Sequence, residues 1–344
     1  MNPRQSPRNA RWQIALSAMA LLYGGLILPG SVAAQSGWRL ASAYSDSTFH
    51  TQNLRRFADE LGRSLPEAPA ITVHANGTLF KPADIHAALR EGRVEMGEVI
   101  LSSLAARDPL WGVDAIPFLV ADYDDAKALW ELSRRHLEKR AAADGLVLLY
   151  AVPWPPQHLY ASRAIGSVKD FRGLAMRTYN PATTRLAELT SAKPTLIQVV
   201  DLARAIGAGE VDLMLTSSWT GVETRAWSRM KYFYTVNGWM PKNGLFVNRA
   251  AFEKLSPAAR ARLQTLAREA EARGWSESQA NAQRYEAELA TAGMQVAAPS
   301  PFLHDDLRRL GERFARDWLK TGGTDGLSTL LSFEARRFAD ARLK

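Results

Sequence analysis

The chain of 344 residues contains no cysteine. Disulfides therefore cannot hold it together, a thiol cannot act as nucleophile, and a lipid-modified N-terminal cysteine cannot anchor it. Two other enzyme signatures are missing as well: there is no Gly-x-Ser-x-Gly turn and no His-Glu-x-x-His helix, and the six histidines are scattered singly. These absences argue against the commonest hydrolase classes and leave ordinary hydrophobic cores as the source of stability.

Long apolar runs are absent beyond the N-terminus. Three arginines within the first eleven residues precede an apolar stretch over residues 14–28, and Val32-Ala33-Ala34 offers small residues for cleavage. This order is typical of a secretory signal peptide. A membrane anchor is the alternative, but a span needs about 20 apolar residues, and this run stops at Pro29. We therefore predict that residues 1–34 are a signal peptide cleaved near Ala34 and that the mature protein is periplasmic.

The charge is not concentrated in any one segment. The formal net charge is +8, yet Lys and Arg alternate with Glu and Asp along stretches such as residues 55–63 and 260–273. Alternation of this kind indicates solvated helix faces rather than a basic stripe. No nucleic-acid partner is therefore expected.

The chain does contain one phrase written twice. Residues 84–96, DIHAALREGRVEM, return 117 positions later as residues 201–213, DLARAIGAGEVDL. In both copies, apolar residues at helical spacing lead to a glycine suited to end a helix, and a short apolar run then begins a strand. Two copies predict two similar α/β lobes with a ligand crevice between them, at the carboxyl ends of the strands.

Strands and helices alternate along the whole chain. Strands are predicted over residues 38–43, 71–74, 94–100, 146–152, 174–178, 195–197 and 244–248. Helices are predicted over residues 54–65, 82–90, 122–145, 180–189, 257–289, 306–320 and 327–343. Trp154-Pro155-Pro156 breaks the pattern and is the predicted hinge. The predicted division is a first lobe over residues 35–157, a second over 158–245, and a return strand with C-terminal helices shared by both over 246–344.

Several short motifs occur in a fixed order along the chain. They are Arg39-Leu40-Ala41, Asn76-Gly77-Thr78-Leu79, Ile116-Pro117-Phe118-Leu119 with Asp122-Tyr123, Phe171-Arg172-Gly173-Leu174-Ala175-Met176-Arg177, Gly209-Glu210-Val211-Asp212, Phe246-Val247-Asn248 and Leu255-Ser256-Pro257. Together, over roughly residues 38–289, they resemble the substrate-binding subunits of tripartite ATP-independent periplasmic (TRAP) transporters, the DctP-type family. The resemblance implies a two-lobed fold of the type II periplasmic-binding-protein kind. It also implies a monomeric receptor, with no cofactor, that closes around a small organic carboxylate and delivers it to TRAP membrane permease subunits.

The resemblance gives Arg177 the central role, because in that family the arginine of this motif grips the ligand carboxylate. The planar guanidinium can donate two parallel hydrogen bonds to a carboxylate. Arg177 ends a predicted strand just before a helix start at Asn180-Pro181, whose free N–H groups also favour an anion. The alternative is a strand arginine paired with a structural acid.

Two departures from the family pattern affect the predicted pocket. Pro156 stands where many relatives place a second arginine, and Thr216 stands where they place an amide. The neighbouring residues are Trp154, Tyr179 and Trp219, so the pocket is expected to be more apolar. We therefore predict a monocarboxylate ligand with an apolar or aromatic body rather than a C4-dicarboxylate.

Other polar residues have two interpretations each. Glu98 interrupts an apolar strand and either contacts the ligand or ends the strand at the surface. Asn76 either points its amide into the crevice or belongs to an Asn-Gly turn. Asp46 and His50 either contact the ligand or cap the first helix. A metal site built from Asp46, His50 and Glu98 would make the protein a periplasmic enzyme, and a ligand sensor for a signalling partner is a further alternative to transport.

Overall fold

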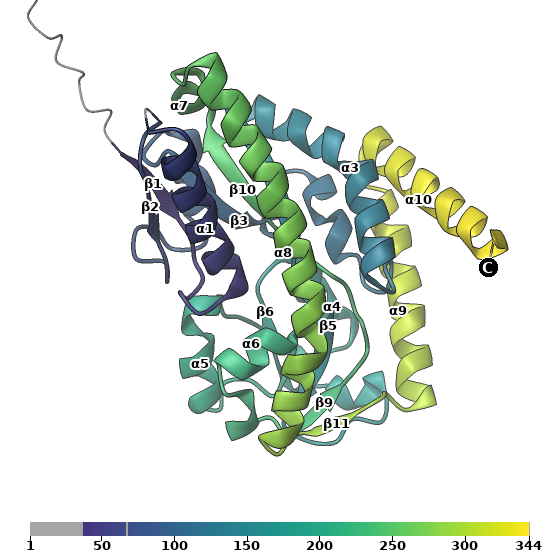
Figure 1. Cartoon of the computed structure of the whole chain (residues 1–344). Coiled ribbons are helices and arrows are strands. Elements are labelled where there is room, and N and C mark those ends of the chain that lie inside the picture. The colour runs from purple at the N-terminus through teal and green to yellow at the C-terminus, as the bar shows by residue number, and fades with distance from the viewer. Residues whose placement is uncertain (1–36, 67, 344) are drawn as a thin grey trace, which may run out of the picture. The chain divides into compact units, whose positions relative to one another are not determined.

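The structure is a computed structural model that describes residues 37–66 and 68–343. The predicted signal peptide lies outside these residues. Within the described residues the strands form two sheets, one five-stranded and one six-stranded (Figure 1). We find no helix in this part of the chain that is long and apolar enough to cross a membrane.

The first sheet has the strand order β2-β1-β3-β10-β4. Its strands are β1 (Trp38–Ala41), β2 (Ile71–His74), β3 (Met96–Ile100), β4 (Leu146–Pro153) and β10 (Lys242–Asn248). β1 is parallel to β2 and β3, whereas β10 is antiparallel to β3 and β4. The return strand predicted from residue 244 is therefore confirmed as β10, which begins two residues earlier.

The second sheet has the order β11-β9-β5-β8-β6-β7. Its strands are β5 (Gln157–Ala161), β6 (Ala175–Thr178), β7 (Lys193–Leu196), β8 (Leu213–Ser217), β9 (Tyr232–Tyr234) and β11 (Gln295–Ala297). β6 is parallel to β7 and β8, and β5 is antiparallel to β8 and β9. Three of these strands, β5, β9 and β11, were not predicted from the sequence, because β9 and β11 are very short and β5 begins directly after the predicted hinge.

Helices flank both sheets (Figure 1). The α-helices are α1 (Phe49–Ser64), α2 (Ile85–Arg90), α3 (Tyr123–Ala143), α4 (Pro181–Leu189), α5 (Val199–Gly207), α6 (Ser218–Glu223), α7 (Arg249–Glu253), α8 (Pro257–Thr291), α9 (Pro301–Leu319) and α10 (Gly323–Leu343). Short 3₁₀ helices are η1 (Leu101–Leu104), η2 (Pro109–Ala115), η3 (Val168–Phe171) and η4 (Ala226–Ser228).

The repeated phrase forms the same unit in each sheet. The first copy is α2, a turn at Gly92 and β3, and the second is α5, a turn at Gly209 and β8. Both glycines have positive φ, +68° and +74°, as a helix end of this kind requires. Each repeated strand lies between a parallel neighbour and an antiparallel one. The prediction of two similar α/β units is confirmed.

Capping side chains set several helix starts where the sequence predicted them. The N–H of Asp125 donates to Asp122 Oδ1 (2.9 Å) at the start of α3, and the N–H of Thr183 donates to Asn180 Oδ1 (2.8 Å) at the start of α4. The expectation that Asp46 or His50 caps the first helix was wrong. The helix begins at Phe49, and its cap is Thr48, whose Oγ1 accepts from the Thr51 N–H.

Two of the places where the chain passes between the sheets lie next to each other. One lies between the ends of β4 and β5, the other between β9 and β10. Backbone hydrogen bonds join the two crossings: Trp154 N–H donates to Pro241 O (2.8 Å), and Gln157 N–H donates to Trp239 O (2.9 Å). The first crossing includes the predicted hinge, whereas the lobe boundaries at residues 157/158 and 245/246 stay a prediction.

The helix α8 contacts elements of both sheets. It packs on α1 and β4 beside the first sheet and on α6 and β11 beside the second (Figure 1). Gly274 permits this close approach, since a Cβ there would lie 2.5 Å from Val152 Cγ2. A single helix therefore packs against both halves of the molecule.

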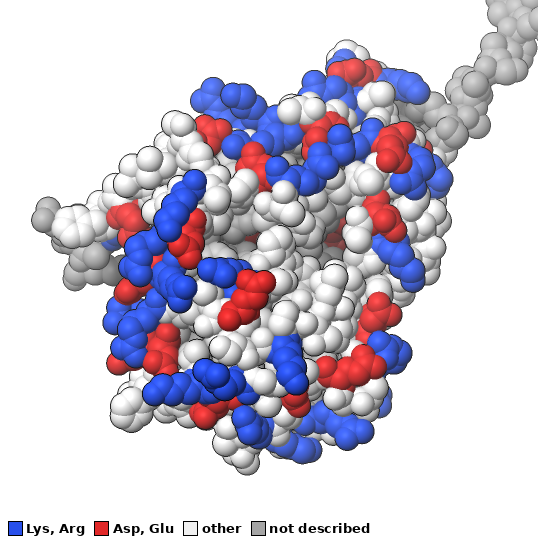
Figure 2. All heavy atoms as spheres, turned by 180° about the vertical axis from the view of Figure 1, so that it is seen from behind, with Lys and Arg blue, Asp and Glu red and all other residues white. Residues whose placement is uncertain are grey.

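The alternation of basic and acidic residues in the sequence is also seen on the surface of the protein. On the face in Figure 2, positive and negative side chains lie interspersed around uncharged surface. Several pairs are one helical turn apart, for example Arg56 with Glu60 and Arg134 with Glu138. This pattern agrees with solvated helix faces.

Candidate ligand-binding site

A cavity of about 50 Å³ lies between the two sheets. The repeated strands β3 and β8 both end at it, and their equivalent residues, Ile100 and Ser217, belong to its lining. The first-sheet side also contributes Tyr44 and Trp154. A water needs about 10–15 Å³ of such volume, so this space suits a compact ligand.

Arg177 reaches this cavity from β6 and is only 5% exposed. Its Nε donates to Ile197 O (3.1 Å), and its Cζ lies 4.7 Å from the centroid of the Tyr179 ring. Burial lowers the pKa of the Arg177 guanidinium to about 10, so it remains charged at neutral pH. A buried charge without a counter-ion is costly.

The structural acid that offered an alternative role for Arg177 is not found. Within the described part of the chain no carboxylate forms an ion pair with this guanidinium, and Arg177 is the one charged side chain in the cavity lining. An anionic ligand would supply the missing countercharge and could accept two parallel hydrogen bonds. The arrangement therefore fits a molecule with one carboxylate.

At the start of α4, which the sequence suggested as an anion site, three backbone donors are engaged within the chain, so the anion role stays a prediction. The N–H groups of Tyr179 and Asn180 both donate to Thr183 Oγ1 (3.0 and 3.2 Å), and the Thr183 N–H donates to Asn180 Oδ1. The side chain of Asn180 donates instead to Ser102 Oγ (2.8 Å). These donors are occupied by the helix cap and by a contact between the lobes.

The remaining polar lining is neutral. Hydroxyl and amide side chains face the cavity: Tyr44, Gln157, Tyr179, Gln198, Thr216, Ser217 and Thr220. The Gln157 Nε2 donates to Pro155 O (2.9 Å), which leaves its Oε1 as an acceptor. Such groups can hydrogen-bond a neutral polar molecule.

Glu98 lies behind the cavity wall and does not line it. It is 3% exposed and accepts hydrogen bonds from Ser42 Oγ (2.7 Å) and Asn243 Nδ2 (3.0 Å). Burial raises the pKa of the Glu98 carboxyl to about 7. The strand continues past it to Ile100, so Glu98 does not end the strand at the surface.

Asn243 connects Glu98 to the wall and was missed in the sequence. Its Oδ1 accepts from Trp154 Nε1 (2.9 Å) and from the Tyr44 hydroxyl (3.3 Å). No spacing rule places a residue of β10 beside Tyr44, because 199 positions separate them. Only the return of β10 to the first sheet brings them together.

The seven residues singled out for ligand contact separate into two groups. Arg177, Trp154, Tyr179 and Thr216 line the cavity, and their ligand roles stay predictions. Glu98, Asn76 and Trp219 lie outside the lining. Asn76 is exposed in a turn with φ +58°, as Asn-Gly turn chemistry favours, and the Trp219 ring lies 5.0 Å from Tyr285.

The three residues of the alternative metal site do not come together. Asp46 is mostly exposed and pairs with Arg55, whereas His50 is buried with its Nδ1 3.5 Å from Glu98 Oε1. Burial lowers the pKa of His50 to about 3. Among the residues that the structure describes, no group of three or more His, Asp or Glu side chains could hold a metal ion.

Side-chain contacts between the lobes flank the cavity. Ser45 Oγ donates to Glu223 Oε1, and on another side Asn180 contacts Ser102. The turn at Gly77 also lies against Val200 at the start of α5. These contacts keep the two sheets together around the ligand space.

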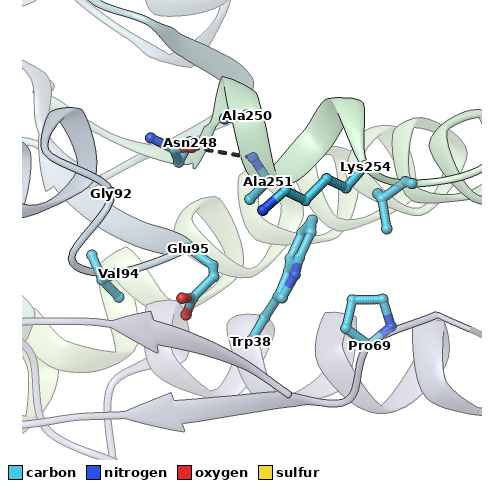
Figure 3. A pocket seen from close by; sticks show the side chains of 10 residues that line it. Trp38, Pro69, Gly92, Val94, Glu95, Asn248, Ala250, Ala251 and Lys254 are labelled. Carbon is cyan, nitrogen blue, oxygen red and sulfur yellow. Dashed lines mark hydrogen bonds between the residues drawn. The ribbon is translucent and has the colours of Figure 1, made fainter. Parts of the chain in front are cut away.

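A second cavity, of about 350 Å³, lies at the first sheet (Figure 3). Trp38, Glu95 and Lys254 lie around it, and its lining comes from β1, the end of β10, α7 and the residues after it, and the segments before β2 and β3. The Glu95 carboxylate is already held by Arg39, through Nε and Nη2, both at 3.2 Å. The second sheet contributes nothing here, so this cavity lacks the two-sided enclosure seen around Arg177.

Comparisons with known proteins agree with this geometry. The family model described as bacterial extracellular solute-binding protein, family 7, matches residues 40–320. A comparison with curated proteins returned no match.

Three of the solved structures that resemble this chain are 31% to 36% identical to it. DctP6 of Bordetella pertussis, an extracytoplasmic solute receptor binding pyroglutamic acid, is 36% identical, with a TM-score of 0.85 over 87% of this chain and 100% of its own. DctP7 of the same organism, also binding pyroglutamic acid, is 33% identical, with a TM-score of 0.85 over 87% and 99%. A TRAP solute-binding protein from a marine metagenome, specific for pyroglutamate, is 31% identical, with a TM-score of 0.85 over 88% and 99%.

Proposed function

Because the chain belongs to family 7 of the bacterial extracellular solute-binding proteins, we propose that its ligand is pyroglutamate or a similarly compact monocarboxylate. The chain is a TRAP-type solute receptor for small organic acids and not an enzyme. TRAP receptors of this kind deliver their ligand to a membrane permease. The single observation that carries the proposed ligand class is Arg177, the one charged side chain of the described cavity lining.

The chemistry of pyroglutamate suits this lining. It is a five-membered lactam with one carboxylate, so Arg177 would hold the acid while neutral groups such as Gln157 and Thr216 would pair with the lactam N–H and C=O. The ring methylenes would lie against Trp154 and Tyr44. The sequence predicted a monocarboxylate with an apolar or aromatic body; the small cavity and its amide groups favour a polar ring as that body.

Closure is the proposed mechanism. Arg177 belongs to the second sheet, whereas Tyr44 and Trp154 belong to the first-sheet side, so one small ligand contacts both only when the crevice is shut. The ligand then shifts a pre-existing equilibrium toward the closed form. We propose that the receptor works as a monomer, and light scattering on the purified protein checks this mass.

Titration calorimetry tests the proposed ligand. We expect L-pyroglutamate to bind in the micromolar range or tighter, with succinate, malate and phenylpyruvate at least about tenfold weaker, a difference of roughly 1.4 kcal/mol. Two probes separate the parts of the ligand: 2-pyrrolidone lacks the carboxylate, and L-proline lacks the lactam carbonyl and carries a positively charged ring nitrogen. Submicromolar binding of a C4-dicarboxylate with pyroglutamate silent would reject the proposal.

Export is a separate prediction. We expect the mature protein to begin near Gln35 and to be recovered in the periplasmic fraction, because an arginine-rich start, a short apolar run and small residues before this position direct cleavage. N-terminal sequencing of the protein from fractionated cells measures the outcome. Recovery of the uncleaved chain in the membrane fraction would mean that the segment is an anchor.

A further inference from the structure

The wall of the ligand cavity on the first-sheet side has two more layers behind it. Tyr44 and Trp154 line the cavity, with ring centroids 4.9 Å apart. Asn243 lies behind both rings, and Glu98 lies behind Asn243. All four residues are nearly fully buried. Each layer contacts the next through hydrogen bonds.

The direction of the Asn243 amide determines whether this wall can form. Its oxygen accepts from both Trp154 Nε1 and the Tyr44 hydroxyl, whereas its nitrogen donates to Glu98 Oε1. An indole N–H can only donate, so a reversed amide would face it with another donor. An ionised carboxylate can only accept, so it requires the amide nitrogen on its side. Glu98 therefore selects the orientation that the two rings need.

We propose that Glu98 is a positioning residue that acts through Asn243 to hold Tyr44 and Trp154 in the geometry that receives the ligand. The ligand-affinity part of this inference rests on the function proposed above. Its structural part, the coupling of Glu98 to Trp154, does not need a ligand and can be measured without one.

The coupling should depend on pH. The groups that face Glu98 come from β1 and the segment after it, α1, β4 and β10: Ser42, Tyr44, His50, Tyr150 and Asn243. Burial lowers the pKa of His50 to about 3 and raises the pKa values of Tyr44 and Tyr150 well above their usual range. Glu98, with its pKa raised to about 7 by burial, is therefore the member of this set that changes charge between pH 6 and 8.

The sign of the effect follows from the donors that face Glu98. Above pH 7 the carboxylate accepts from both Ser42 and Asn243. Below it, the added proton can lie on the oxygen that faces Ser42, whose hydroxyl turns to accept it, while the hydrogen bond from Asn243 loses the strengthening that the carboxylate charge gave it. The aromatic wall is thus held more firmly at pH 8 than at pH 6.

The ligand-free test follows the indole N–H resonances by ¹H–¹⁵N NMR. The sequence has ten tryptophans, and Trp154→Phe assigns the relevant resonance by its loss. We expect the Trp154 resonance of the wild type to shift between pH 6 and 8 with a midpoint near pH 7. In Glu98→Gln, whose uncharged side-chain oxygen still faces the Asn243 amide nitrogen, it should stay near the wild-type position of pH 6 at every pH. In Glu98→Ala it should be displaced throughout.

A matched control comes from the same strand region. Glu95→Gln alters a carboxylate three residues earlier that pairs with Arg39 at the edge of the second cavity. It should leave the Trp154 titration unchanged. The inference is overturned if the resonance of Glu98→Ala coincides with that of the wild type, or if Glu98→Gln titrates as the wild type does. Should Glu98→Ala fail to fold, the Glu98→Gln titration decides alone.

Affinity supplies the second readout. With the acid that binds wild type best, Glu98→Ala should bind about tenfold more weakly at pH 8, as expected for loss of a buried hydrogen-bond partner. Glu98→Gln should bind within about twofold of the affinity that wild type shows at pH 6, and it should lose the pH dependence that Glu98 causes. Equal affinity of Glu98→Ala and wild type would contradict the inference. If the wild type binds no acid in the panel, the proposed ligand class fails, while the Trp154 resonance still decides the positioning role.

Discussion

Replacing Arg177 by alanine is expected to weaken ligand binding roughly 30- to 4,000-fold while the protein still folds. The reason is that truncating one partner of a desolvated, hydrogen-bonded ion pair costs about 2–5 kcal/mol. In the free protein the guanidinium is buried with no ion-pair partner within the described residues, so its removal takes away an unpaired charge rather than a structural bridge. Calorimetry with L-pyroglutamate measures the change in affinity.

Two further variants make the Arg177 experiment specific. Arg177→Lys should also bind poorly, because a compact ammonium cannot reproduce the two parallel hydrogen bonds of the fork. Arg172→Ala removes an exposed arginine five positions earlier in the same motif and should leave affinity unchanged. If Arg177→Ala bound the ligand within about threefold of wild type, a difference under ~0.7 kcal/mol, the carboxylate role would be refuted.

Replacing Lys242 by methionine is expected to lower the free energy of unfolding by about 3 kcal/mol at pH 8. Lys242 begins β10 and is 1% exposed, and its Nζ lies 3.8 Å from Asp114 Oδ2, in a carboxylate that is itself buried. Methionine keeps the length of the side chain and the backbone N–H bond to Asp114 (2.8 Å) but leaves the carboxylate without its cation. Breaking a buried pair in this way costs about 3–5 kcal/mol.

The deficit of Lys242→Met should shrink as the pH falls toward 5. Burial raises the pKa of Asp114 to about 6, and Lys242 counteracts the rise, so the variant should raise that pKa further. An acid with a raised folded-state pKa stabilises the protein less as the pH rises, because the unfolded chain ionises first. Thermal unfolding at both pH values measures this difference.

Controls for the Lys242 experiment use the same change elsewhere and the removal of both charges. Lys254→Met, at an exposed position after α7, should leave the unfolding midpoint unchanged. The double variant Lys242→Met with Asp114→Asn should recover much of the lost stability, since no uncompensated charge remains. A deficit of the same size at pH 5 and pH 8 would mean that packing, not the carboxylate, causes it.

Local patterns in the sequence were sufficient to predict much of the fold. The repeated phrase predicted two equivalent helix-turn-strand units, because apolar spacing and the glycine at each helix end are local signals. The helix starts at Asp122 and Asn180 were predicted for the same reason, and both residues cap their helices. The start of α1 was missed because the cap there is Thr48 and Asp46 pairs with Arg55 instead.

The candidate site was only partly accessible from the sequence. Arg177 was identified through the family motif. Trp154, Tyr179 and Thr216, which also line the cavity, were identified because they stand at or beside positions where the family has polar contacts. Asn243 was not found, since its contact with Tyr44 depends on β10 returning across the first sheet. The position of Glu98 behind the wall likewise depends on which strand lies beside β3 and which side chain that strand places there.

The helix α8 has a mechanical consequence for how the crevice opens. Its 35 residues correspond to a rod about 52 Å long, attached beside α1 and β4 at one part and beside α6 and β11 at another. Separating the sheets must therefore bend this rod or detach one of its ends. We therefore expect the stiffness of this long helix to oppose the opening of the crevice.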